Sequence, residues 1–170
     1  MKTQRGFSLI ELLIVVVIIG IVAAIAIPNL ISARRAANEG SAISTLRTLH
    51  SANVSYSSTV GAGNYAGTAG TVGTSPLSDL AAANLIDSVL GLGEKSGYRF
   101  VGDHTVSLPT VPGTFYFAGN PSTPSGILLS GSRRVGVATD GVIRGDVIAA
   151  TLATPFDAVT LAATQLIATN

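Results

Sequence analysis

The chain opens with an almost unbroken apolar run from Phe7 to Ile27, in which only Ser8 and Glu11 are polar. A helix over such a run is about 30 Å long, which matches the hydrocarbon core of a bilayer. A short basic segment, residues 1–6, precedes it. The pattern predicts a membrane-spanning helix over residues 7–27.

Three kinds of protein begin with such a run. A secretory signal peptide has a shorter apolar core of about 7–15 residues and then a small-residue cleavage site, whereas here no clean site precedes Pro28. A plain membrane anchor has no use for Glu11, because a charged group at the centre of a span costs about 2.5–3.5 kcal/mol. A filament subunit does have a use for it. A cut after Gly6 frees an amine on Phe7, which the carboxylate of a staggered neighbour can neutralise.

The string Gly6-Phe7-Ser8-Leu9-Ile10-Glu11-Leu12-Leu13 resembles the processing motif of type IV pilins and the related pseudopilins. The similarity continues to about Ala37. The resemblance implies that a prepilin peptidase of the inner membrane cuts after Gly6 and that the new N-terminal Phe7 is methylated. It also implies that Glu11 sets the register of assembly.

The resemblance further implies a homo-oligomeric helical filament, with the peptidase and an inner-membrane assembly platform as partners and membrane lipid around the subunit before assembly. The subunit is then a single-pass inner-membrane protein that moves into an extracellular or periplasmic filament. The leader, residues 1–6, is placed in the cytoplasm. Basic residues on both sides of the span leave the orientation open on charge alone.

The stretch from Gly20 to Pro28 is expected to be the weakest part of the helix. Gly20 lowers helix propensity, and Pro28 has no N–H to donate inside a helix. Gly20 and Ala24 also form a pair of small residues that lets membrane helices approach closely. In filaments of the resembling family the corresponding stretch can lose helical structure.

Beyond Pro28 the pattern becomes amphipathic, which predicts one long helix over residues 7–58 whose second half packs on a globular head. The packed stripe consists of Ile43, Leu46, Leu49, Asn53 and Tyr56.

The head, residues 59–170, is predicted to combine a short helix with an antiparallel sheet, so that the fold class is α+β and pilin-like. Residues 59–74 are rich in Gly and Thr and indicate an irregular surface loop. A short helix is expected over 75–91, with Ser75 as its cap and Pro76 in its first turn.

Three or four antiparallel strands are expected within residues 97–146. The β-type runs are 98–101, 114–117, 127–129, 133–138 and 142–144, and Thr139-Asp140-Gly141 indicates a hairpin. The residues expected to face the helix are Phe100, Phe115, Phe117, Val137 and Ile143. The segment 147–170 has no clear pattern and is expected either to wrap the head as a strand or short helix or to form a subunit contact.

Composition and charge indicate neither a catalytic site nor a binding site. The net charge of +1 gives no general attraction to nucleic acid, and there is no cysteine. The two histidines, His50 and His104, are expected to be structural. No catalytic residue, cofactor or metal ligand is predicted. A calcium site from Asp140 with Asp146 or Asp157 is the weaker alternative to a hairpin turn. Arg133 and Arg134 are expected to be solvated.

The leading hypothesis is therefore the subunit of a type IV pilus-like filament, serving adhesion, twitching motility or DNA uptake. A pseudopilin of a type II secretion system is the nearest alternative. A minor pilin or adhesin that binds a surface through residues 59–74 or the C-terminal segment is another, and a membrane-anchored enzyme is the least favoured. Glu11 favours the body of the fibre, and the head lacks the acidic calcium loop expected of the common secretion-system subunit.

Overall fold

The structure of the protein is a computed structural model that describes residues 6–147 and 149–167. Most of the expected leader, with Lys2 and Arg5, lies outside the described residues, as do residues 148 and 168–170. The chain divides into two compact units, Met1–Arg34 and Arg35–Asn170. The second unit is called the head below.

Helix α1 runs from Leu9 to Thr59, and Pro28 lies inside it. Its first part is the only described helix that is long and apolar enough to cross a membrane, with a mean hydropathy of 3.2 over its most apolar window and none of that window buried. The large apolar side chains from Leu9 to Leu30 are exposed, because nothing in the first unit covers them. The predicted long helix with an apolar first half is confirmed.

The head contains one antiparallel sheet of five strands in sequential order. The strands are β1 (Glu94–Lys95), β2 (Tyr98–His104), β3 (Phe115–Pro121), β4 (Arg134–Ala138) and β5 (Ile143–Asp146). A turn at residues 139–142 joins β4 to β5, and Gly141 in this turn has a φ of 72°, which favours glycine. The α+β fold class is confirmed.

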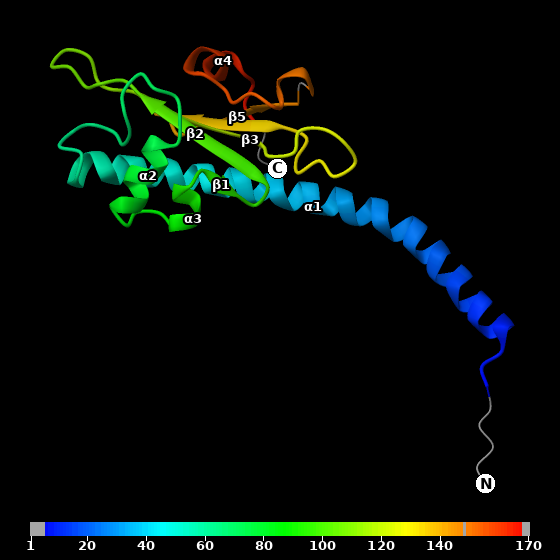
Figure 1. Cartoon of the computed structure of the whole chain (residues 1–170). Helices are drawn as coiled ribbons and strands as arrows, with labels where there is room; N and C mark the ends of the chain where they lie inside the picture. The colour runs from blue at the N-terminus through cyan, green and yellow to red at the C-terminus, as the bar shows by residue number, and fades with distance from the viewer. Residues whose placement is uncertain (1–5, 148, 168–170) are drawn as a thin grey trace, which may run out of the picture. The chain divides into compact units, whose positions relative to one another are not determined.

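Helix α1 lies on one side of the sheet and α4 on the other (Figure 1), and the two faces bury different sets of side chains. Because side chains alternate along a strand, Phe115 and Phe117 of β3 point toward α1, while Tyr116 and Ala118 point to the opposite face. Both faces are covered, and every residue of β3 is therefore buried. The core on the α1 face includes Ala42, Leu46, Leu49, Phe100, Phe115, Phe117, Val135 and Val137, with Ile43, Tyr56 and Ile143 partly buried at its edge.

The C-terminal segment covers the second face of the sheet. It contains a 3-10 turn η1 (Ala149–Thr151) and helix α4 (Ala158–Ala163), which lies over β4 (Figure 1). Phe156 and Leu161 are buried against Tyr116 and Ala118. A Cβ on Gly136 would lie 2.6 Å from a methyl group of Leu161, so this approach requires glycine.

The single helix expected over 75–91 is wrong, because the structure has two shorter helices. Helix α2 (Ser75–Ala82) ends before Asn84, whose φ of 57° cannot continue a right-handed helix. Asp87 then caps α3 (Ser88–Gly91) by accepting a hydrogen bond from the Leu90 N–H. Ser75 is not the cap of α2: Thr74 holds that position, with no side-chain cap bond.

The strand expected at 127–129 is also wrong. These residues belong to the loop between β3 and β4, in which Ile127 and Leu128 are 80% and 74% exposed. Pro124 has no N–H to give to a ladder, and Gly126 turns the chain with a φ of 89°. The sheet has five strands rather than the expected three or four, and the strand that the sequence did not predict is the two-residue β1.

Replacing Phe117 tests this two-faced core. Phe117 is 1% exposed on the central strand, so Phe117→Ala is expected to lower the free energy of unfolding by about 3–5 kcal/mol. Val159→Ala, at a residue 79% exposed on α4, is expected to change it by less than about 0.5 kcal/mol. Denaturant unfolding of the full chain in detergent, followed by tyrosine fluorescence, measures both. Equal losses would contradict the assignment of the core.

Candidate functional site in the N-terminal segment

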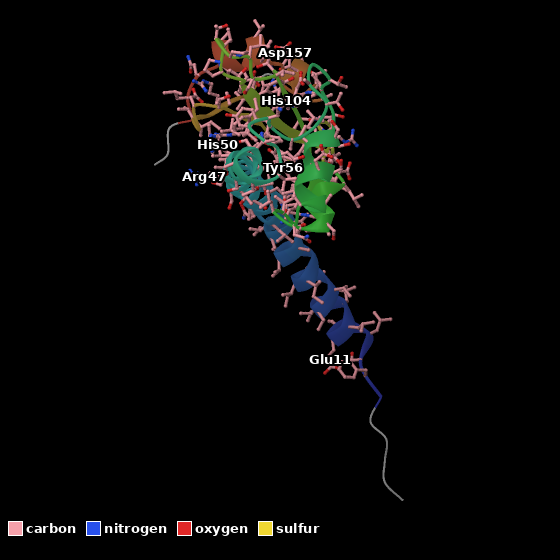
Figure 2. The ribbon with its side chains drawn as sticks, turned by 90° about the vertical axis from the view of Figure 1, so that its left-hand side faces the viewer. Glu11, Arg47, His50, Tyr56, His104 and Asp157 are labelled. Atoms are coloured by element: carbon pink, nitrogen blue, oxygen red, sulfur yellow. The ribbon has the colours of Figure 1, made fainter. Side chains whose placement is uncertain are left out.

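Glu11 lies in the first turn of α1, where its carboxylate meets the start of its own helix (Figure 2). Its Oε2 accepts a hydrogen bond of 2.9 Å from the Ser8 N–H. In a Ser-x-x-Glu capping box the Glu side chain accepts a hydrogen bond from the backbone N–H of the N-cap residue. Glu11 makes this bond with Ser8, and the bond satisfies an N–H that has no partner within the helix. Sequence reasoning missed this role, although the spacing of Ser8 and Glu11 was its signal.

Gly6 and Phe7, on the two sides of the expected cut, make no packing contacts that the fold requires. Phe7 is 84% exposed. A Cβ on Gly6 would meet no atom within 4 Å, and its φ is not in the left-handed region. None of the described residues therefore requires glycine at position 6, and a requirement for glycine would come from a partner.

Gly20 and Pro28 lie in an uninterrupted helix. A Cβ on Gly20 would also meet open space, so any close approach at this position involves a molecule outside the chain. Pro28 donates no hydrogen bond to the preceding turn. The next residue, Asn29, donates from its side-chain Nδ2 to the carbonyl of Ile25 at 3.1 Å. A loss of helix between Gly20 and Pro28 stays a prediction.

A family model described as the prokaryotic N-terminal methylation motif matches residues 1–27. The N-terminal segment of the chain is thus similar to that of type IV pilins and pseudopilins.

Three relatives show how this similarity is distributed. The type IV wide pilus major component PilA4 of Thermus thermophilus is 59% identical over 39 residues, which are 23% of this chain and 30% of that protein. The type IV major pilin protein PilA of Myxococcus xanthus is 51% identical over 53 residues, 31% of this chain and 24% of that protein. The type II secretion system core protein G of Pectobacterium carotovorum is 41% identical over 49 residues, 29% of this chain and 31% of that protein.

The chain thus spans about a quarter to a third of the length of these curated relatives. No significant match to a solved structure was found. The similarity covers the pilin-type motif, and the head has to be interpreted from its own residues.

The head uses its acidic residues for structure. The three carboxylates considered for calcium are each engaged: Asp140 pairs with Arg144, Asp146 pairs with Arg134, and Asp157 caps α4. The hydrogen bond from Arg144 lowers the pKa of Asp140, and the Thr160 N–H lowers the pKa of Asp157. In residues 6–147 and 149–167 no group of three or more potential ligands lies together.

Arg134 is not solvated, which corrects the expectation for it. Its side chain is 8% exposed and makes two hydrogen bonds with the Asp146 carboxylate, at 2.9 and 2.8 Å. The guanidinium carbon also lies 4.0 Å from the ring centre of Phe156, a cation–π contact. The pair joins β4 to β5 and holds the C-terminal segment. Arg133 pairs with Glu39 of α1 at 3.1 Å.

The two histidines lie on different elements, α1 and β2 (Figure 2). His50 Nε2 lies 3.3 Å from the Thr139 carbonyl, and its ring packs beside Phe115. His104 is 6% exposed at the end of β2, and its Nδ1 has no hydrogen-bond partner among the described residues.

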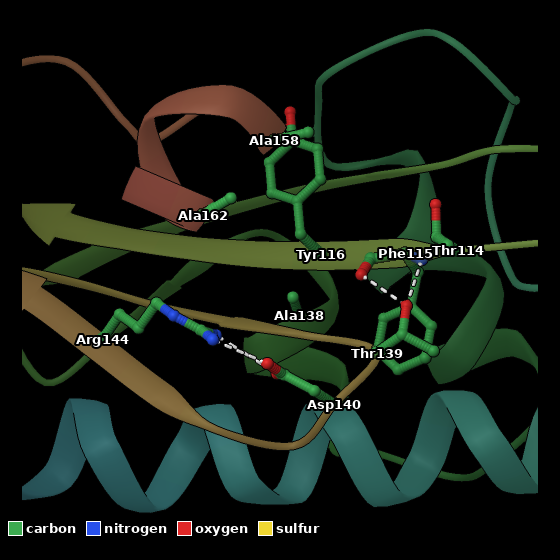
Figure 3. A pocket seen from close by; sticks show the side chains of 9 residues that line it. All are labelled: Thr114, Phe115, Tyr116, Ala138, Thr139, Asp140, Arg144, Ala158 and Ala162. Atoms are coloured by element: carbon green, nitrogen blue, oxygen red, sulfur yellow. Dashed lines mark hydrogen bonds and ion pairs between the residues drawn. The ribbon is translucent and has the colours of Figure 1, made fainter. Parts of the chain in front are cut away.

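One pocket of about 300 Å³ lies between the sheet and α4 (Figure 3). The Asp140 and Arg144 that line it are joined to each other at 2.7 Å. The Thr139 hydroxyl is bonded to the backbone of Phe115. Burial, reinforced by Asp103 and Asp157, raises the pKa of the pocket's Tyr116 to about 12, so this phenol stays protonated at neutral pH. In this pocket Asp140 and Arg144 are bonded to each other and Thr139 to the backbone, so these groups do not form a pair of nucleophile and base.

The loop 59–74 is more firmly held than its composition indicates. Tyr65 packs on Phe115 with ring centres 4.5 Å apart. The buried Asn53 of α1 accepts a 3.0 Å hydrogen bond from the Ala66 N–H. The Gly/Thr composition carried no signal for these anchors.

The buried Arg134–Asp146 pair predicts a large effect of removing one partner. Asp146→Ala leaves a buried guanidinium uncompensated and is expected to lower the free energy of unfolding by about 3–5 kcal/mol. Asp140→Ala removes a chemically matched pair whose Asp side chain is 45% exposed, and its expected effect is below about 1 kcal/mol. Thermal or denaturant unfolding of the full chain compares them, and a larger loss for Asp140→Ala would refute the ranking.

Proposed function

We propose that this chain is the structural subunit of a type IV pilus-like filament, assembled through the apolar half of α1 after leader cleavage. The observation that carries the proposal is the long run of exposed apolar side chains from Leu9 to Leu30, most of which lies within the matched methylation motif. Burying one Leu, Ile or Val side chain is worth about 1.5–3 kcal/mol. The run therefore needs lipid before assembly and neighbouring helices afterwards.

The motif supports the processing steps of the proposal. A prepilin peptidase cuts between Gly6 and Phe7, and Phe7 is then N-methylated. The open space beside Gly6 supports its selection by the peptidase, because the fold itself does not require it. We also propose that the subunit is a single-pass inner-membrane protein before an assembly platform moves it into the filament.

The Gly20 side of the helix supports close contact between subunits. Because Gly20 and Ala24 are small and Gly20 faces open space in the lone chain, a second helix can approach there. Extension of the filament by loss of helix between Gly20 and Pro28 is part of the proposal.

The relatives support two settings for such a subunit. Two of those named above are pilus components and one is a core protein of a type II secretion system. We propose the pilus, with adhesion, twitching motility or DNA uptake as its use, because the three head acids weighed for calcium are committed to other partners. Processed protein in filaments sheared from cells supports a pilus, and processed protein confined to the envelope supports a pseudopilin.

A role as a minor pilin or adhesin is the remaining alternative. Because Tyr65 and Ala66 anchor the loop 59–74 in the core, a surface-binding function is restricted to its exposed part. The proposed role is structural, without catalysis, cofactor, metal or nucleic acid, and the relatives, which are pilus and secretion-system components, support it.

Two substitutions of Glu11 separate its two possible uses. Glu11→Gln keeps a side-chain oxygen that can accept from the Ser8 N–H but removes the charge, whereas Glu11→Ala removes both. If the charge neutralises the amine of a neighbouring Phe7, both variants are cleaved normally and yield at least about tenfold less filament, the equivalent of about 1.4 kcal/mol per contact. The measurement compares sheared and cell-bound protein by immunoblot, with Glu94→Gln as the control. Wild-type filament yield from Glu11→Gln would limit Glu11 to capping its own helix.

A further inference from the structure

The loop between β3 and β4 is held against α1 by a row of polar contacts. Arg35 Nη2 donates to the Ile127 carbonyl at 2.8 Å, and Asn38 Nδ2 donates to the Ser130 carbonyl at 2.8 Å. Glu39 accepts from the N–H and hydroxyl of Ser132 at 2.7 and 2.6 Å. Residues 35, 38 and 39 share one face of a helix. We call this row the loop clamp.

The loop clamp holds two large apolar side chains out in solvent. Ile127 and Leu128 are 80% and 74% exposed. Single exposed apolar residues are common, but here two adjacent ones lie on a loop that four hydrogen bonds hold against α1. The fold gains no burial from them, which leaves both side chains available to a partner.

Arg35, beside this tip, and Arg47 are the two described arginines of the head without a carboxylate partner. Every described Lys or Arg after residue 90 is paired with a carboxylate. Arg35 has no carboxylate partner in residues 6–147 and 149–167. Its Nε is buried without a hydrogen-bond partner among these residues, so a ligand would have to meet the Nη end of the guanidinium. A guanidinium has five N–H donors, and its geometry suits phosphate.

The position of Arg35 in the sequence favours a lipid phosphate. The apolar character of the helix continues to Ile31, and four further residues advance a helix by about 6 Å. The polar layer on each side of a bilayer core is about 5–7 Å thick. If the span extends beyond the predicted residues 7–27 to include Leu30 and Ile31, Arg35 reaches the level of the headgroups.

We propose that Ile127, Leu128 and Arg35 form a second membrane contact of the subunit before assembly. The Ile127–Leu128 tip enters the boundary between headgroups and acyl chains, and the Arg35 guanidinium binds a phospholipid phosphate. The contact holds the head against the bilayer at its base and is broken when the subunit is extracted. It rests on the proposed function only in requiring that the apolar run spans a membrane.

Because the chain has no cysteine, single-cysteine variants allow this contact to be measured in the full chain. Leu128→Cys, Leu108→Cys and Ile18→Cys are each labelled with an environment-sensitive fluorophore and placed singly in nanodiscs of phosphatidylcholine and phosphatidylglycerol. Lipids with a quencher high on the acyl chain then report depth. Leu108 is the matched control: it is 60% exposed, and its neighbour Ser107 contacts Gly63 beyond the far end of α1.

The proposal predicts quenching at position 128 at least about twofold stronger than at 108, as for a side chain in the interfacial region. Arg35→Gln is expected to lower the quenching at 128, whereas Arg47→Gln, at another arginine of α1 without a described carboxylate partner, leaves it unchanged.

Equal quenching at 128 and 108, with strong quenching at Ile18→Cys, would overturn the membrane contact and leave the span intact. Crosslinking of position 128 to a second copy in filaments, without quenching in nanodiscs, would also overturn it and assign the tip to a subunit interface. Absence of quenching at Ile18→Cys would overturn the span itself and with it the proposed function.

Discussion

The structure depends on one unmet requirement: the apolar surface of α1 between Leu9 and Leu30 is not covered by any of the residues that the structure describes. Water is a poor solvent for such a surface, so the first half of the helix is stable only in lipid or against other helices. The same helix is a packing element of the head from Arg35 onward. The first part of α1 therefore needs lipid or neighbouring helices around it, and the second part packs into the core of the head.

Helix α1 is not the only element that packs on the sheet of the head. The α1 stripe around Leu46 and Leu49 covers one face of the sheet, and the C-terminal segment with Phe156 and Leu161 covers the other. The Arg134–Asp146 pair and the close approach of Leu161 to Gly136 fix that segment. A small domain without disulfides obtains in this way a sheet whose central strand is buried on both sides.

The chemistry of α1 changes along one face. Its contacts are polar at residues 35, 38 and 39, where they hold the loop between β3 and β4, and mainly apolar from Ala42 to Tyr56. The polar part fixes the base of the head, and the apolar part forms the core. The proposed membrane contact lies at the polar part, where the head begins.

Local patterns predicted those parts of the molecule that are specified by neighbours in sequence. The span, the long helix, the hairpin at Asp140 and the alternation around Phe117 belong to this class. The buried ion pair of Arg134 could not be predicted, because Asp146 lies opposite Arg134 only once the register of β4 and β5 is known. The apolar triplet at 127–129 is as compatible with a strand as with an exposed loop, since its environment depends on contacts with residues more than 90 positions away.

In the candidate site, the motif predicted Gly6, Phe7 and Glu11 as a set, but not the hydrogen bond from Ser8 that gives Glu11 a second role. The central claim is that the chain is a processed filament subunit. Mass spectrometry of the N-terminal peptide, in filaments sheared from intact cells, tests it most directly. The account predicts a peptide that starts with methylated Phe7. A peptide that still carries Met1, in cells with an active prepilin peptidase, would contradict it.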